Sequence, residues 1–170
     1  MSEKLEAGHA MPEITLPAVG GGEVKIGGSG RWQLVIVYRG KHCPICTRYL
    51  QSLEGMQGDF AGVATEVVAV SGDPREKAEA HAGEIGLSVP VGYDLSVEQM
   101  RALGLYVSSP RSTQETDRPF AEPGTYLVNP DGAIQIVDIS NAPFSRPDLA
   151  GLLRGIGIIQ DNDYPIRGTG

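Results

Sequence analysis

An apolar run followed closely by both cysteines constrains this chain more than any other feature of its sequence. The run, LVIVY at 34–38, has the length and composition of a buried β-strand. A short polar loop at 39–42 leads from it to Cys43-Pro44-Ile45-Cys46, a C-x-x-C motif. Proline is favoured at the first position of a helix, where its missing N–H would have no partner anyway. We therefore expect a strand, a loop and then a helix that begins at the motif.

Apolar residues continue a helical pattern beyond the motif. They recur every three or four residues, as one face of a helix does, at Ile45, Tyr49, Leu53 and Met56. In such a helix Cys43 lies at the N-terminal tip and Cys46 lies one turn inside. We predict a Cys43 sulfur that reagents can reach and a Cys46 sulfur that is shielded. The pattern is expected to break at Gly58.

The surroundings of the motif favour an ionised sulfur. Unpaired N–H groups and the positive end of the helix dipole stabilise a thiolate, and such sites lower the pKa of cysteine from about 8.5. The whole chain has a formal net charge of −7, yet the segment 25–52 holds cations and no carboxylate. Within it, Arg39, Lys41 and His42 lie closest to the cysteines in sequence. These three are candidates for stabilising a thiolate.

Two other interpretations of the cysteine pair are weaker. A zinc site would need more ligands, but the chain has no second cysteine pair, and His9, His42 and His81 lack metal-binding spacing. We therefore expect no metal. Inert core cysteines are common, but two cysteines three residues apart at a strand-to-helix turn favour redox chemistry. His42 is interpreted as a solvated loop residue, with a proton donor or a further cation as the alternatives.

Length and composition fit one globular domain over residues 1–170, because 41% hydrophobic residues suffice for a substantial core. Segments 1–10 and 160–170 lack a core pattern and are expected to be loose ends. No apolar run is long enough for a transmembrane span, and the charged N-terminus lacks the apolar stretch of a secretory leader. We expect a cytoplasmic protein. Its acidic balance gives no reason to bind nucleic acid or an anionic membrane.

The first half of the chain alternates between expected strands and helices. Short strands on either side of the glycine turn at 20–22 form an N-terminal hairpin. A second buried strand is expected at 66–70, after the helix that follows the cysteines. Strand and helix in alternation predict an α/β fold with a parallel core. In such sheets ligands bind at the carboxyl ends of the strands, where the cysteine loop emerges.

The next helix is expected over 75–85. Asp73 is predicted as its N-cap and Pro74 as its first residue, both of which are favoured there. The helix is charged and rich in alanine, so it belongs in the outer layer. His81 within it is expected at the protein surface.

The second half of the chain ends in a hairpin and a helix. Segment 108–123 is polar, contains prolines and lacks periodicity, so we expect a loop that is either functional or mobile. Two strands at 125–128 and 134–137, joined by an Asn-Pro-Asp-Gly turn, form an antiparallel hairpin. A last helix begins near 146–148.

Several of these segments resemble the AhpC/TSA family of the thioredoxin-fold superfamily, which comprises peroxiredoxins and peroxiredoxin-like proteins. The resemblance extends over nearly the whole chain and is carried by MPEITL at 11–16, YRG at 38–40, CPIC at 43–46, VAVSGD at 68–73, YD at 93–94 and TYLVNPDG at 125–132. It implies a thioredoxin-like α/β fold, in which a central mixed sheet is flanked by helices.

The resemblance also implies a thiol peroxidase that needs no cofactor. In such enzymes a cysteine thiolate reduces a hydroperoxide and becomes a sulfenic acid, which a second thiol converts to a disulfide. For this chain it implies a disulfide between Cys43 and Cys46, reduced by an external dithiol such as thioredoxin or glutaredoxin. The resemblance is compatible with a homodimer but does not decide the oligomeric state.

The cysteine motif departs from the P-x-x-x-T-x-x-C signature of typical peroxiredoxins. Alignment on the strand places the reactive cysteine at Cys46, whereas alignment on the Cys-Pro pair places it at Cys43. Neither alignment recovers the proline or the threonine, and expected exposure favours Cys43. Peroxiredoxins place an arginine before a late strand to hold the thiolate. Pro123 stands in that place here, with Arg118 as the nearest substitute.

The C-P-x-C spacing is also similar to that of thioredoxin-like thiol-disulfide reductases. Those proteins carry a cis-proline before the equivalent late strand, and Pro123 is the candidate for it. The same two cysteines would then reduce a disulfide substrate instead of a hydroperoxide. A redox sensor without catalytic turnover, or a binding module that retains the fold, is the third interpretation.

Overall fold

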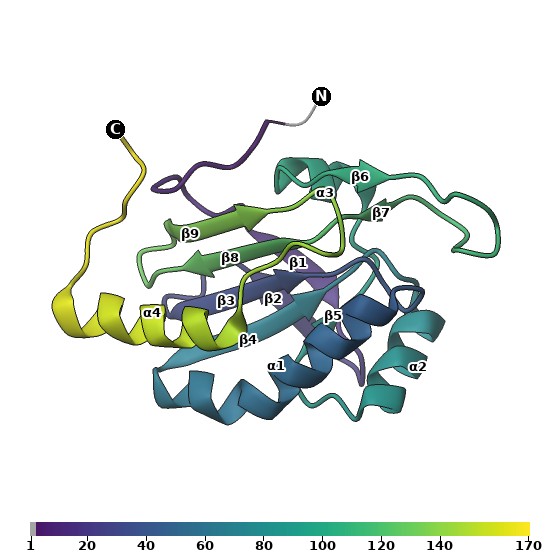
Figure 1. The fold of residues 1–170 in the computed structure, drawn as a ribbon, viewed down its shortest axis with the longest axis horizontal. Helices are drawn as coiled ribbons and strands as arrows, with labels where there is room; N and C mark the ends of the chain where they lie inside the picture. The colour runs from purple at the N-terminus through teal and green to yellow at the C-terminus, as the bar shows by residue number, and fades with distance from the viewer. Residues whose placement is uncertain (1–2) are drawn as a thin grey trace.

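The computed structural model describes residues 3–170 and contains a central sheet of five strands in the order β5-β4-β3-β8-β9 (Figure 1). Strands β3, β4 and β5 are parallel, and β8 and β9 are antiparallel to their neighbours. The bounds of these strands are β3 Trp32–Val37, β4 Thr65–Val70, β5 Val91–Gly92, β8 Gly124–Val128 and β9 Ile134–Ile139. The predicted central mixed sheet is confirmed.

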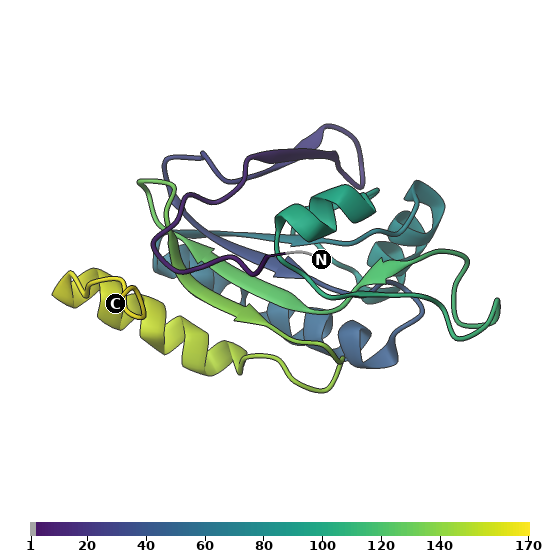
Figure 2. The same cartoon turned by 90° about the horizontal axis from the view of Figure 1, so that it is seen from above.

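Helices and a hairpin cover the two faces of the sheet. The helices are α1 Pro44–Gly62, α2 Arg75–Ile85, α3 Val97–Ala102 and α4 Leu149–Asn162. The predicted N-terminal hairpin pairs β1, Ile14–Pro17, with β2, Glu23–Ile26. Helices α1 and α4 lie on one face, and the hairpin and α3 lie on the other (Figure 2).

Strand β3 is buried on both faces, which explains its unbroken apolar sequence. Leu34 and Ile36 pack into the core beneath α1 and α4. Val35 and Val37 point the opposite way, into the core beneath the hairpin and α3. All four side chains are at most 1% exposed. The strand therefore fixes the loop that carries Cys43 to the rest of the molecule.

Helix α1 begins at Pro44, as predicted, but it extends beyond the expected break. Gly58 is exposed, and a glycine on the solvent side weakens a helix without ending it. Phe60 in the next turn is fully buried against the sheet. Packing of this last turn outweighs the glycine, so the helix ends at Gly62.

Helix α2 has the predicted bounds but a different N-terminus. Pro74 is its N-cap and not its first residue, and no side chain caps it. The Asp73 carboxylate instead accepts a hydrogen bond from the backbone N–H of Lys41 at 2.8 Å. His81 is only 2% exposed, and its Nε2 lies 2.8 Å from Oγ1 of Thr47 on α1. The predictions of Asp73 as the N-cap and of His81 at the protein surface were wrong, because α2 packs against α1 and the cysteine loop.

Segment 108–123 is not irregular throughout. Its ends pair as antiparallel strands β6, Val107–Ser108, and β7, Phe120–Ala121. Between them, Arg111 and Glu115 form an ion pair at 2.8 Å. The pairing returns the chain toward the sheet and holds the intervening loop beside the cysteines.

Both ends of the chain make contacts that the expectation of loose ends missed. The N–H of Gly8 donates to the Ile134 carbonyl at 2.8 Å, and the N–H of Ile134 donates to the His9 carbonyl at 2.9 Å. Helix α4 continues to Asn162, beyond the expected boundary at 160. Residues 1 and 2 lie outside the described residues. Over residues 3–170, every helix is too short or too polar to cross a membrane.

Candidate active site

The Cys43 sulfur caps the N-terminus of helix α1. The backbone of Cys43 is extended, with φ −110° and ψ 102°, and its sulfur accepts the backbone N–H of Cys46 at 3.4 Å. Its carbonyl accepts the N–H of Thr47 at 3.1 Å. Most N-cap side chains supply an oxygen to this position. Here the sulfur takes that place, so it meets the unpaired N–H groups of the first turn.

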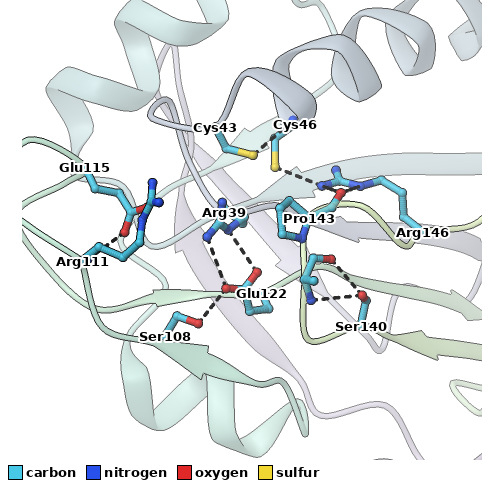
Figure 3. Close-up of polar contacts among 11 residues, drawn as sticks. Arg39, Cys43, Cys46, Ser108, Arg111, Glu115, Glu122, Ser140, Pro143 and Arg146 are labelled. Atoms are coloured by element: carbon cyan, nitrogen blue, oxygen red, sulfur yellow. Dashed lines mark hydrogen bonds and ion pairs between the residues drawn. The ribbon is translucent and has the colours of Figure 1, made fainter.

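The second sulfur lies beside the first, and the two cysteines do not form a disulfide (Figure 3). Cys46 is fully buried, as predicted. Cys43 is only 2% exposed, so its sulfur is less exposed than predicted and is reached through the groove that it lines. The reason is tertiary, because segments 111–115 and 143–144 border the same groove as Cys43. Spacing within the helix could not show this.

The pKa values of the two cysteines are shifted in opposite directions. The hydrogen bond from the Cys46 thiol lowers the pKa of Cys43 to about 5, assisted by the backbone N–H of Cys46 and by Arg39, although burial opposes the shift. The same thiol–thiol hydrogen bond, together with burial, raises the pKa of Cys46 far above its usual range. Near neutral pH the pair therefore carries one negative charge, on Cys43.

Arg39 contacts the Cys43 sulfur and lowers its pKa, and a buried carboxylate fixes the position of the guanidinium (Figure 3). Its Nε lies 3.0 Å from Oε1 of Glu122, whose side chain is only 4% exposed. Ser108 donates its hydroxyl to Oε2 of the same carboxylate at 2.6 Å. The Arg39 guanidinium carbon lies 4.7 Å from the centre of the Phe120 ring. No local pattern in the sequence indicated Glu122 or Ser108, because both come from the distant β6 and β7 segments.

The other two predicted cations have partners of their own. Lys41 extends its ammonium group to Glu84 at 3.5 Å. Arg118 pairs with Asp117 at 3.3 Å on the exposed loop. The contacts that lower the pKa of Cys43 most are those with Cys46 and Arg39. Of the predicted cations, Arg39 is the one that the structure brings into contact with the Cys43 sulfur.

His42 is neither solvated nor a cation. Its ring packs edge-on against Phe120 with the ring centres 4.5 Å apart. Both ring nitrogens are buried without a hydrogen-bond partner in the described structure. Burial, and next the nearby Arg39, lower the pKa of His42. The imidazole is therefore neutral near pH 7 and adds no positive charge to the site.

Pro123 precedes strand β8 as predicted, but its peptide bond is trans, like every other peptide bond within residues 3–170. Its carbonyl accepts the N–H of Ser140 at 3.0 Å and so extends the pairing of β8 with β9. The prediction of a cis-proline at the site was wrong.

Arg146 is a further site residue that the sequence did not predict. One of its terminal nitrogens, Nη2, lies 3.3 Å from the Cys46 sulfur (Figure 3). It is the only Lys or Arg between Arg118 and Arg154, but nothing in that isolation indicates a cysteine one hundred residues earlier as its partner. The fold joins them by placing the segment before α4 beside the first turn of α1.

An open groove of about 710 Å³ leads to Cys43. The loop before α1 and the first turn of α1 contribute Arg39, His42, Pro44 and Ile45 to its lining. Segment 111–115, with the exception of Thr113, and residues 143–144 also line it. Within residues 3–170, no three His, Cys, Asp or Glu side chains gather as a metal site would need. The groove therefore offers thiol chemistry and no metal-binding cluster.

Gly40→Ala is expected to lower the free energy of unfolding by about 1–3 kcal/mol, because Gly40 has φ +143° and an added Cβ would lie 2.6 Å from Oδ1 of Asp73. Asp73 cannot yield easily, since it is buried and holds the Lys41 N–H. Denaturant titration of the reduced protein measures the change. Gly55→Ala is the matched control, because this α1 glycine has open space around it. In the control the free energy of unfolding should rise by roughly 0.5–1 kcal/mol. Equal effects of the two substitutions would contradict the account.

Comparison with known families identifies the chain. A model of the AhpC/TSA family matches residues 7–137. The chain belongs to the AhpC/TSA family. No curated protein sequence matches it.

Several solved structures share the AhpC/TSA fold with this chain. A mutant of peroxiredoxin 6 from Arenicola marina has a TM-score of 0.76 at 19% identity, covering 94% of this chain and 75% of that chain. A peroxiredoxin-like protein from Aquifex aeolicus has a TM-score of 0.77 at 15% identity, covering 91% and 88%. AhpC from Mycobacterium tuberculosis has a TM-score of 0.75 at 17% identity, and the match covers 96% of this chain and 97% of that chain. The predicted thioredoxin-like fold is confirmed.

The two arginines beside the cysteine pair come from separate elements. Arg39 comes from the loop after β3, and Arg146 comes from the segment before α4. Each guanidinium contacts a different sulfur of the pair.

Proposed function

We propose that this chain is a thiol peroxidase in which Cys43 reduces a hydroperoxide and Cys46 then forms an intramolecular disulfide with it. The observation that carries the proposal is the Cys43 sulfur at the N-terminus of α1, where it accepts the N–H of Cys46 and has Arg39 beside it. Such a site favours the thiolate, which is the nucleophilic form of cysteine. Membership of the AhpC/TSA family supports the reaction class.

The first step transfers one oxygen atom to sulfur. The Cys43 thiolate attacks the hydroxyl oxygen of the hydroperoxide, so an S–O bond forms while the O–O bond breaks. The departing alkoxide takes a proton from water and leaves as an alcohol. Cys43 becomes a sulfenic acid, and the hydroperoxide is reduced by two electrons. Arg39 stabilises the thiolate, and its fixed guanidinium faces the charge that develops on the oxygens.

The second step closes the disulfide. The Cys46 sulfur attacks the sulfur of the sulfenic acid, so the S–S bond forms, the S–O bond breaks, and the thiol proton leaves with the hydroxide as water. An external dithiol protein of the thioredoxin or glutaredoxin kind then reduces the disulfide by thiol exchange. We place this cycle in a reducing compartment such as the cytoplasm, where disulfides are transient.

A disulfide reductase is the second candidate, and the size of the groove favours it. A volume of about 710 Å³ exceeds what a small peroxide needs. Phe144 on its rim is 79% exposed, so an extended polypeptide could lie against it. Cys43 would then form a mixed disulfide with the substrate, and Cys46 would release it.

Turnover assays separate the two candidates. Purified protein is mixed with hydrogen peroxide, or with an organic hydroperoxide, and with either dithiothreitol or a thioredoxin system. We expect many equivalents of peroxide consumed per protein, and insulin reduction no faster than with dithiothreitol alone. Insulin reduction without peroxide turnover would establish the reductase instead. Inactivity in both assays would leave only a sensor or a binding module.

A further inference from the structure

The Arg146 guanidinium is held against the Cys46 sulfur by several contacts. Its Nη2 lies 3.3 Å from that sulfur, and it also donates to the Pro143 carbonyl at 2.7 Å. Its Nε donates to the same carbonyl at 3.0 Å. The guanidinium carbon lies 4.9 Å from the centre of the Tyr49 ring. The Pro143 carbonyl and the Tyr49 ring together fix the position of the charge at Cys46. Figure 3 shows the guanidinium between Pro143 and the Cys46 sulfur.

The charge of Arg146 is not neutralised by a carboxylate. Within residues 3–170 its guanidinium forms no ion pair with an acidic side chain, whereas Arg39 is paired with Glu122 at 3.0 Å. Its partners, the Pro143 carbonyl oxygen and the face of the Tyr49 ring, are both neutral, so they hold the guanidinium without cancelling its charge. An anion at Cys46 would therefore meet a preformed cation.

We propose that Arg146 is the catalytic residue of the second step, in which it stabilises the Cys46 thiolate that attacks the oxidised Cys43. The inference rests on the proposed function and assigns each sulfur its own arginine. Arg39 serves Cys43 in the first step, and Arg146 serves Cys46 in the second.

The order of the steps explains why Cys46 needs its own cation. While Cys43 is a thiolate, Cys46 keeps its proton and donates it in a hydrogen bond, which together with burial raises the pKa of Cys46. Oxidation or mixed-disulfide formation makes Cys43 neutral, so the anion that opposed ionisation of Cys46 is gone. Arg146, already in contact with the sulfur, then favours the thiolate. Arg146 keeps its own protons throughout. The proton that Cys46 loses passes to solvent water, from which the departing hydroxide takes one.

An aromatic disulfide, dithionitrobenzoate, separates the two steps without any peroxide. Attack by the Cys43 thiolate forms a mixed disulfide and releases one coloured thionitrobenzoate anion. Attack by Cys46 on the Cys43 sulfur then forms the internal disulfide and releases a second anion. Stopped-flow absorbance therefore gives one rate for each cysteine.

For Arg146→Gln we expect the second release to slow roughly 10- to 100-fold, as loss of one charge-assisted hydrogen bond does, while the first changes less than about twofold. The pH midpoint of the second rate should rise. Arg146→Lys should restore much of the rate, because it keeps the charge. Arg154→Gln removes the same charge from an exposed position on α4 and should leave both rates unchanged.

Four outcomes would overturn the proposal. Equal slowing of both releases would indicate a merely structural role for Arg146, as would an unchanged pH midpoint. Selective slowing of the first release would make Cys46 the primary nucleophile. Unchanged rates would remove Arg146 from the chemistry. Failure of the peroxidase proposal is detected separately, as absence of peroxide turnover in the unmodified protein.

Discussion

Cys43→Ser is expected to reduce hydroperoxide consumption to the background of the assay. The substitution removes the sulfur that the N-terminus of α1 and Arg39 hold as a thiolate. A serine hydroxyl in the same place stays protonated and is a poor nucleophile without a base beside it. The remaining sulfur, that of Cys46, is fully buried and does not line the groove that leads to Cys43, so a hydroperoxide cannot reach it. Continuous measurement of peroxide loss with dithiothreitol tests this.

Cys46→Ser should behave differently from Cys43→Ser. The serine hydroxyl can still donate a hydrogen bond to the Cys43 sulfur, so the first step should survive. We expect one equivalent of peroxide consumed without reductant, and a sulfenic acid on Cys43 that dimedone traps and mass spectrometry locates. If the trapped adduct instead appears on Cys46 in Cys43→Ser, the assignment of the nucleophile is wrong.

Arg39→Met is expected to cost about 3 kcal/mol of folding stability and to slow Cys43 at acidic pH. The substitution leaves the Glu122 carboxylate buried without its cation, which is the costly way to break a buried ion pair. It also removes a cation that lowers the pKa of Cys43, so that pKa should rise. Denaturant titration measures the change in stability. The pKa of Cys43 is obtained from alkylation rates between pH 4 and 7, a window of about three units around the lowered pKa.

A second variant separates these two effects of Arg39. Arg39→Met combined with Glu122→Met replaces both charges by apolar side chains, which is often nearly neutral for stability. The double variant should therefore regain most of the lost stability while the pKa of Cys43 stays raised. A double variant with the acidity of the unmodified protein would show that Arg39 does not tune Cys43.

Local sequence signals predicted the framework of the site. The apolar run at 34–37 became β3, and Pro44 became the first residue of α1, because both depend on neighbours along the chain. The position of the cysteines at a helix N-terminus followed from these two elements. Arg39 was predicted as a cation at the site for the same reason, since it lies only four residues before Cys43.

Contacts between distant segments decided what the sequence could not show. Arg146 meets Cys46 across one hundred residues, and Glu122 meets Arg39 across eighty-three. Arg118 was predicted as the nearest substitute for the arginine that peroxiredoxins place before a late strand, but its guanidinium pairs with the neighbouring Asp117. Burial of Cys43 likewise depends on the loops that border its groove, and such loops carry no periodic signal.

The acidity of Cys43 tests the central claim most directly. Reduced protein is alkylated with iodoacetamide across a pH series, and mass spectrometry of the Cys43 peptide gives the rate at each pH. Only the thiolate reacts, so the rate is full above the pKa and falls as pH drops through it. We predict a midpoint near pH 5, with Cys43 fully reactive at neutral pH. A midpoint near that of a free cysteine, about 8.5, would contradict the account.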